Sequence, residues 1–168
     1  MPKITALVHT YNDATRIGRL LETLRACDEV LLIDHGSTDT TRDVAGEYAA
    51  TIKPGVPGVS RGVYATDARH DWILCLLPHE ALSETFEAAL FEWKDRDDQP
   101  TDKPPDEVSP EACTFAVGIR EETAEGWSDK PPQSRLVNRN KVNWQDDLPP
   151  SPGDAEVLAG HILSFRNP

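Results

Sequence analysis

The chain has 168 residues and a formal net charge of −12 at pH 7, with 38% hydrophobic and 27% charged residues. This length predicts a single domain, residues 1–168, with enough sequence to bury an ordinary core. The acidic charge excludes non-specific binding to nucleic acid or to an anionic membrane, because both require a basic surface. A small anionic ligand remains compatible with it, provided that an arginine, a metal or a helix N-terminus supplies local positive potential.

The cysteine content and the absence of long apolar runs bear on the cellular compartment. Cys27, Cys75 and Cys113 are odd in number and widely spaced, so neither a disulfide framework nor a zinc site is indicated. No segment approaches the roughly 18 apolar residues of a membrane-spanning helix. These features favour a cytoplasmic protein without a transmembrane segment.

Apolar runs alternate with helical patterns through residues 1–93. The expected elements are a strand at 4–9, a helix with Ile17 and Leu20 at helical spacing, a strand at 29–34, a helix capped by Ser37, a short strand at 50–53, a helix at 60–69, a strand at 72–77 and a helix from Ser83 to about Trp93. Nearly all-apolar strands that alternate with helices predict a parallel sheet covered by helices on both faces.

The composition changes after Trp93. Residues 94–111 are charged and rich in proline, which predicts a mobile acidic loop. Beyond it, the stretches ACTFAVGIR, SRLVNR, KVNWQ and VLAGHILSF predict short strands, with a hairpin turn at Arg139-Asn140. The predicted fold class is therefore α/β, a Rossmann-type parallel sheet with helices on both faces, followed by a smaller α+β part at residues 112–168.

Three polar stretches follow the predicted strands. In an open parallel sheet, ligands bind beyond the carboxyl ends of the strands, which here means Thr10 to Asn12, Asp34 to Asp39 and Leu77 to Glu80. Asp34 comes directly after four apolar residues, so its carboxylate can accept hydrogen bonds from a base or a ribose at the sheet edge. The local sequence supports an alternative equally well, in which Asp34 and Ser37 only cap the next helix.

The blocks ITALVHTYND, CDEVLLIDHGSTDTTRDVAGEYAA and SRGVYATDARHDWILCLLPHEALS together resemble family 2 glycosyltransferases of the GT-A fold, close to the bacterial type that builds lipopolysaccharide cores. The similarity spans residues 4–93, and PPQSRLVNRNKVNWQ is similar to a later block of the family. The resemblance implies a nucleotide-binding half at 1–93 and an acceptor-side half at 112–168. It also implies transfer of a sugar from a UDP- or GDP-type donor to a glycan or lipid-linked acceptor.

The same resemblance implies roles for single residues on the donor side. Thr10 and Tyr11 would line the base pocket, Asp34 would meet the uracil or ribose, and Asp39 would support that loop. Arg61 falls on an arginine of the family and could approach the diphosphate. The alternative for Arg61 is an exposed charge on a helix.

The largest departure from the family lies at the end of the 72–77 run. The family has an Asp-x-Asp motif there, whose oxygens hold a divalent ion against the diphosphate. Leu77, Pro78 and His79 take those positions here, and only Glu80 keeps the family identity. Leucine cannot ligate a metal, and neighbouring side chains of an extended segment point to opposite sides. We therefore expect Mn²⁺ or Mg²⁺ to be disfavoured, assign no metal ligand, and favour a surface histidine beside a glutamate that approaches a helix. The alternative is a transition metal such as Mn²⁺ held by His79 and Glu80.

Inverting transfer also requires a general base near the acceptor hydroxyl. Asp146 and Asp147 are the acidic pair in a comparable place, with simple solvation of a loop as the alternative. Two functions remain open. The first is a glycosyltransferase in which Arg61, Arg135 or Arg139 replaces the ion as counter-charge. The second is a catalytically inactive GT-A domain that binds a nucleotide or a protein partner.

Overall fold

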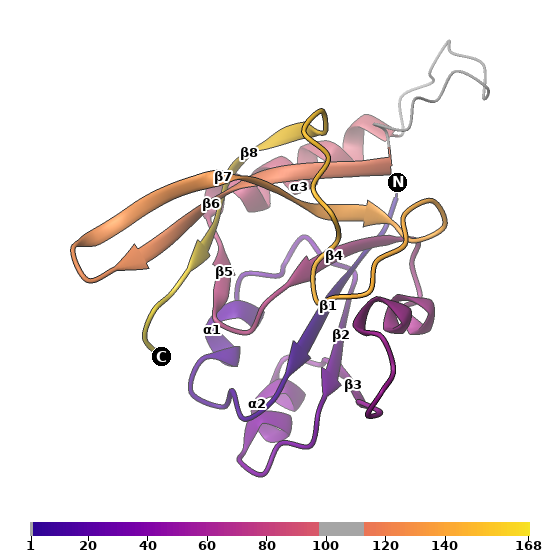
Figure 1. Cartoon of the computed structure of the whole chain (residues 1–168), viewed down its shortest axis with the longest axis vertical. Coiled ribbons are helices and arrows are strands. Elements are labelled where there is room, and N and C mark those ends of the chain that lie inside the picture. The colour runs from indigo at the N-terminus through magenta and orange to yellow at the C-terminus, as the bar shows by residue number, and fades with distance from the viewer. Residues whose placement is uncertain (1, 98–112) are drawn as a thin grey trace.

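The computed structural model describes residues 2–97 and 113–168. Its elements in chain order are β1 (Ile4–Thr10), α1 (Ile17–Leu21), β2 (Glu29–Asp34), α2 (Thr41–Glu47), β3 (Thr51–Pro54), the 3-10 helix η1 (Arg61–Asp67), β4 (Trp72–Leu76), β5 (Glu80–Leu82), α3 (Glu84–Asp97), β6 (Thr114–Thr123), β7 (Gly126–Asn138) and β8 (Glu156–Ser164). All strands belong to one sheet in the order β3-β2-β1-β4-β7-β6-β8-β5 (Figure 1). Among these described residues, no helix has both the length and the hydropathy needed to cross a membrane.

The strands β3, β2, β1 and β4 form the parallel part of the sheet. β1 lies between β2 and β4, and all seven of its residues are buried, as expected for a strand covered on both faces. Thr10 pairs with Asp34, and Val8 pairs with Leu76. The carboxyl ends of β1, β2 and β4 therefore meet at one edge of the sheet.

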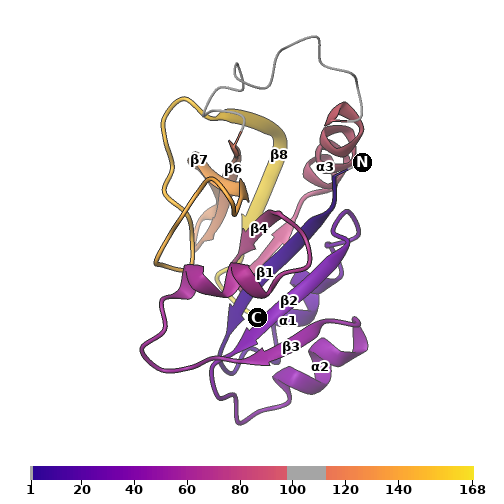
Figure 2. The ribbon, with the colours of Figure 1, turned by 90° about the vertical axis from the view of Figure 1, so that its right-hand side faces the viewer.

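Alternate side chains of these strands enter two separate cores, because successive residues of a strand point to opposite faces. Val8 and Leu74 pack with α1, α2 and α3 in the larger core. Leu7 and Ile73 pack with Tyr64 of η1 and with the loop after β7. Figure 2 shows α1 and α2 on one side of the parallel strands and η1, the unlabelled magenta helix, on the other. The prediction of helices on both faces is confirmed.

The C-terminal part continues the same sheet. β7 pairs antiparallel with β4, with Trp72 opposite Asn138 and Leu74 opposite Leu136. β6 is antiparallel to β7, β8 is parallel to β6, and β5 is antiparallel to β8. β6 and β7 have 10 and 13 residues, so they are longer than the short strands that the sequence predicted. Figure 1 shows them extending beyond the rest of the sheet as a two-stranded arm.

Two local predictions for this part are wrong. The hairpin turn lies between Thr123 and Gly126, where the paired arm ends, and not at Arg139-Asn140. The stretch KVNWQ, residues 141–145, is a loop instead of a strand. Its Trp144 is buried against η1, so the apolar residue that suggested a strand instead anchors the loop to the smaller core.

The predicted acidic loop begins later than expected. Residues 94–97 belong to α3, because Lys94 turns into the protein instead of into solvent. Its ammonium donates to the carbonyl of Ala26 at 3.0 Å and to the carboxylate of Asp28 at 2.8 Å. The remainder of the predicted mobile loop, residues 98–111, lies outside the described residues.

Candidate functional site

Asn12 joins the loops that follow β1 and β2. Its side-chain oxygen accepts hydrogen bonds from the backbone amides of Thr38 at 2.7 Å and Asp39 at 3.3 Å. The backbone amide of Asn12 donates to the hydroxyl of Ser37 at 2.9 Å. Asn12 has a φ of 53°, a conformation that asparagine tolerates better than most residues. The two loops are therefore held in one arrangement before any ligand binds.

Asp13 is a second link at this edge, and the sequence analysis missed it. The carboxylate is 2% exposed and accepts from the Thr10 hydroxyl at 2.6 Å and the Tyr11 amide at 3.0 Å. Arg16 donates to its other oxygen at 2.6 Å. Thr10 is thus buried and engaged, whereas the side chain of Tyr11 is 58% exposed. Of the two residues expected in a base pocket, only Tyr11 presents an open face.

Asp34 serves the turn into α2 and also stands at the ligand edge. It is buried, and it accepts hydrogen bonds from the hydroxyl of Ser37 and, at 3.3 Å, from the Ser37 amide. Arg42, which the sequence analysis did not single out, lies with Nε 3.4 Å from the Asp34 carboxylate. Because the Arg42 side chain is 60% exposed, the edge carries a cation that solvent or a ligand can reach.

Asp39 orders the same loop. Its carboxylate accepts from the hydroxyl and, at 2.9 Å, the amide of Thr41, and from the amide of Ala14 at 3.2 Å. The hydrogen bond from the Thr41 hydroxyl is the main cause that holds the pKa of Asp39 below its ordinary value. Asp39 therefore joins the start of α2 to the loop after β1.

The turn after β4 does not provide ligands for a hard cation. Leu77 has no donor atom, and both oxygens of Glu80 are taken by Arg135, at 2.8 Å from Nη1 and 2.7 Å from Nη2. Glu80 also accepts from the Leu77 amide at 2.6 Å. Within residues 2–97 and 113–168, no group of three His, Cys, Asp or Glu side chains is arranged to hold a metal. These residues do not fit Mn²⁺ or Mg²⁺, and we derive no step through such an ion.

Glu80, which was expected either as part of a metal site or as a glutamate that approaches a helix, is 1% exposed. The sequence missed its partner Arg135, because 55 residues separate the two. His79 and Pro78 are half-buried. Burial lowers the pKa of His79, the Glu80 charge opposes this, and the Arg16 charge adds to it. The turn after β4 therefore lies near the loop after β1.

Two of the three arginines proposed as counter-charges are committed elsewhere. Arg135 is 2% exposed and bound to Glu80. Arg139 donates to the carbonyls of Ala65 at 2.9 Å and Ala68 at 2.5 Å, and to the carboxylate of Asp71 at 3.2 Å. Both arginines hold the fold together, which leaves Arg61 as the accessible one of the three.

Arg61 and Asp147 form an ion pair with 3.3 Å between Nη1 and Oδ1. The two side chains are 40% and 43% exposed. The sequence analysis assigned them to different tasks, diphosphate contact and general base, and the structure brings them together. Asp146, by contrast, is exposed and makes no ion pair with any described residue.

A pair of imidazoles lies next to this ion pair. His9 Nδ1 and His35 Nε2 are 2.9 Å apart, and Tyr64 packs edge-on against both rings, with centroids 5.5 and 6.2 Å away. Burial lowers the pKa of His9 to about 4, opposed by the charge of Asp147 and assisted by that of Arg61. Burial also lowers the pKa of His35. The sequence held a signal for this pair. Thr10 and Asp34 are paired between β1 and β2, and one histidine directly precedes Thr10 while the other directly follows Asp34.

Comparison with known proteins identifies the family. Residues 5–98 match the model of glycosyl transferase family 2. An uncharacterized glycosyltransferase of Rickettsia bellii is 35% identical over 89 residues, which are 51% of this chain and 30% of that protein. Its counterpart in Rickettsia felis is 34% identical over 91 residues, 52% of this chain and 32% of that protein. The chain thus spans about a third of the length of these curated relatives.

Solved structures agree with the predicted fold. S. aureus TarS 1-349 superposes with a TM-score of 0.59 at 13% identity, over 98% of this chain and 58% of that chain. The mannosyltransferase PcManGT from Pyrobaculum calidifontis, in complex with GDP-Man and Mn²⁺, gives 0.51 at 19% identity, over 71% and 36%. At these identities the similarity concerns the fold. Because the family model covers more than half of the residues, the chain belongs to glycosyl transferase family 2.

Proposed function

We propose that this chain binds a nucleotide-diphosphate sugar of the UDP or GDP type and transfers the sugar to a glycan or lipid-linked acceptor. The observation that carries the proposal is the edge at the ends of β1 and β2, where Asn12 and Asp13 hold the two loops in place in a family 2 domain. The Pyrobaculum mannosyltransferase, which has a similar fold, binds GDP-Man, and this supports a nucleotide-sugar ligand.

We assign one task to each group that could contact the nucleotide-sugar donor. The exposed ring of Tyr11 offers a stacking surface for the base. Asp34, fixed by Ser37, can accept a further hydrogen bond from the base or ribose. Arg42 and Arg61 are exposed cations that can bind the diphosphate and offset the charge that develops on it as the sugar leaves.

Of the acidic pair, we propose Asp147 as the general base. Its carboxylate lies against Arg61, and its charge reaches His9 at the end of β1, whereas Asp146 points to solvent. A diphosphate that binds Arg61 competes with Asp147 for the same guanidinium. Donor binding would then release the carboxylate to accept a proton from the acceptor hydroxyl.

A second candidate function is a domain that binds a nucleotide or a protein partner without turnover. One observation favours it: Leu77 and the Glu80–Arg135 pair occupy the place where the family holds its metal. In the catalytic proposal, arginine charge has to replace that metal. In the second proposal, the donor edge, meaning the loops at the ends of β1 and β2, still binds a ligand, but the chain no longer transfers a sugar.

The two proposals are separated by titration calorimetry and a donor-turnover assay. UDP and GDP are titrated with and without Mn²⁺, using wild type, Asp34→Ala and the control Asp43→Ala, an exposed carboxylate in the first turn of α2. We expect one nucleotide to bind independently of metal, and Asp34→Ala alone to weaken it. Release of sugar from the donor supports the enzyme, and binding without release supports the inactive domain. Failure of both nucleotides to bind would refute donor binding, and with it the enzyme, and would leave only a domain that binds a protein partner.

A further inference from the structure

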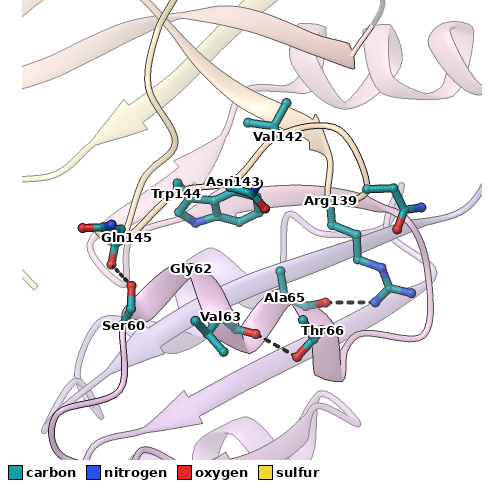
Figure 3. Close-up of a pocket in the computed structure, with 11 residues that line it drawn as sticks. Ser60, Gly62, Val63, Ala65, Thr66, Arg139, Val142, Asn143, Trp144 and Gln145 are labelled. Atoms are coloured by element: carbon teal, nitrogen blue, oxygen red, sulfur yellow. Dashed lines mark hydrogen bonds between the residues drawn. The ribbon is translucent and has the colours of Figure 1, made fainter.

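A cavity of about 560 Å³ lies between η1 and the loop after β7 (Figure 3). This volume is within the roughly 300–1,000 Å³ of small-molecule sites. None of the residues 10–13, 34–39 or 77–80 lines it, so it is distinct from the donor edge. It lies beside the ion pair of Arg61 and Asp147. The lining residue Ser60 is next to Arg61 in the chain, and the lining residue Gln145 is two residues before Asp147.

The two walls of the cavity are fixed to each other. A Cβ on Gly62 would lie 1.8 Å from the carbonyl oxygen of Trp144, so η1 and the loop are in backbone contact there. The Arg61 amide and the Ser60 hydroxyl both donate to the carbonyl of Gln145, at 2.9 and 3.0 Å. At the other end, Figure 3 shows Arg139 reaching the carbonyl of Ala65. The cavity is therefore formed before a ligand arrives.

The lining carries no free charge. No carboxylate contributes to it, and its one cation, Arg139, is held by the carbonyls of Ala65 and Ala68 and by Asp71. A phosphate or carboxylate ligand would lose its hydration without gaining an ionic partner, which is unfavourable. The cavity is suited to a neutral ligand.

The lining combines apolar walls with neutral hydrogen-bonding groups. Val63 of η1 and Val142 of the loop after β7 both line the cavity. Among the described residues, the side-chain amides of Asn140 and Asn143 have no protein hydrogen-bond partner, and an amide both donates and accepts. Trp144 is 8% exposed, and its indole N–H is buried without an acceptor. This N–H lies against η1 and has no accessible surface, so the asparagine amides are the polar groups that the cavity offers to a ligand.

We propose that this cavity binds a neutral sugar unit. A pyranose offers a C–H face to the valines, and hydroxyl groups that donate to and accept from the two asparagine amides. The inference rests on the proposed function only where it identifies this sugar as part of the acceptor glycan, since binding of the sugar does not require turnover.

The test uses saturation-transfer NMR on the full chain with methyl glycosides of neutral hexoses, a methyl hexuronide and uridine. Val63→Trp fills the cavity from an exposed position, and Val157→Trp, at an equally exposed site on β8, is the matched control. Asn143→Ala removes one amide without adding bulk. Thermal melting confirms that each variant is folded, and UDP binding is measured in the same samples.

We expect neutral glycosides to bind wild type and Val157→Trp, and to lose about tenfold or more in affinity in Val63→Trp and Asn143→Ala. UDP affinity should not change in any of these variants. Absence of glycoside binding, or binding unaffected by Val63→Trp, would overturn the proposal. So would equal affinity for the hexuronide, or a response to uridine alone. If glycosides bind and calorimetry finds binding of neither UDP nor GDP, the proposed function fails and this site stands.

Discussion

Arg135 and Glu80 face each other through two hydrogen bonds of 2.8 and 2.7 Å, and each side chain is 2% exposed. The pair joins β7 to the turn after β4, and Arg135 also donates to the carbonyl of Cys75 at 3.1 Å. Glu80 is thus part of a buried internal ion pair. Its role in this chain is to hold the second half of the sheet against the first.

Breaking this pair should destabilise the fold strongly. Glu80→Gln leaves the Arg135 guanidinium buried without a counter-charge, for which we expect a loss of about 3–5 kcal/mol in the free energy of unfolding. Glu121→Gln, at an exposed pair with Lys130, should change it by less than about 1 kcal/mol. Urea unfolding monitored by tryptophan fluorescence measures both. Adding Arg135→Met to Glu80→Gln should restore part of the loss; equal effects of Glu80→Gln and Glu121→Gln would contradict this account.

His9, which is buried, and the half-buried His35 predict a pH dependence of stability. Burial lowers the pKa of His9 from 6.5 to about 4, so between these values the unfolded chain binds a proton that the folded chain does not. The free energy of unfolding should therefore fall as the pH falls from 6.5 to 4, by up to about 3 kcal/mol from His9. His35, whose pKa burial also lowers, acts in the same direction.

The measurement is urea unfolding at pH 7, 6, 5 and 4. His9→Gln removes this titration and should flatten the curve between pH 6.5 and 4. His70→Gln, at a half-buried position away from the pair, should leave the slope unchanged. A slope that persists in His9→Gln would assign the pH dependence to other groups.

Alanine should have opposite effects on stability at two glycines. Gly62 lies at the contact between η1 and the loop after β7, whereas Gly46 lies in an open position. Gly62→Ala places a methyl group 1.8 Å from the Trp144 carbonyl oxygen, and relief of that clash should cost about 1–3 kcal/mol. Gly46→Ala in α2 meets nothing within 4 Å and should stabilise the chain by up to about 1 kcal/mol through helix propensity. Thermal unfolding compares them, and a neutral Gly62→Ala would show that the loop is not held as described.

The parallel half could be predicted from the sequence because its signals are local. All seven residues of β1 are buried, so the strand appears as a mostly apolar run, and Asp34 directly follows a second apolar run. The C-terminal half was predicted less well. Trp144 looked like a strand residue because its apolar character fits either a strand or an anchored loop, and only the packing against Gly62 distinguishes the two.

The sequence predicted that certain polar residues gather at one edge of the sheet, but it did not predict their partners. Tyr11, Asp34 and Asp39 lie at the expected edge, since parallel strands bring their carboxyl ends together. The pairing of Glu80 with Arg135, and of His9 with His35, joins residues 55 and 26 positions apart. No local pattern specifies such pairs, because they depend on strand register and on which side chains share a face.

The ion pair of Arg61 and Asp147 gives the sharpest test of the proposed chemistry. If Arg61 binds the diphosphate, Arg61→Gln should weaken nucleotide binding by about tenfold. Asp147→Asn frees the guanidinium, so it should tighten nucleotide binding several-fold, an exposed pair contributing up to about 1 kcal/mol. The same substitution should abolish sugar transfer, because the general base is lost.

Asp146→Asn is the matched control, since its exposed carboxylate has the same charge and lies one residue away. It should leave both nucleotide affinity and transfer close to wild type. Calorimetry with UDP and GDP gives the affinities, and product formation from a donor and a glycan acceptor gives the rates. If Asp146→Asn and Asp147→Asn behave alike, the ion pair has no special role. If Asp147→Asn weakens nucleotide binding, Arg61 does not contact the diphosphate, because release of a bound counter-charge can only favour an anionic ligand at that guanidinium.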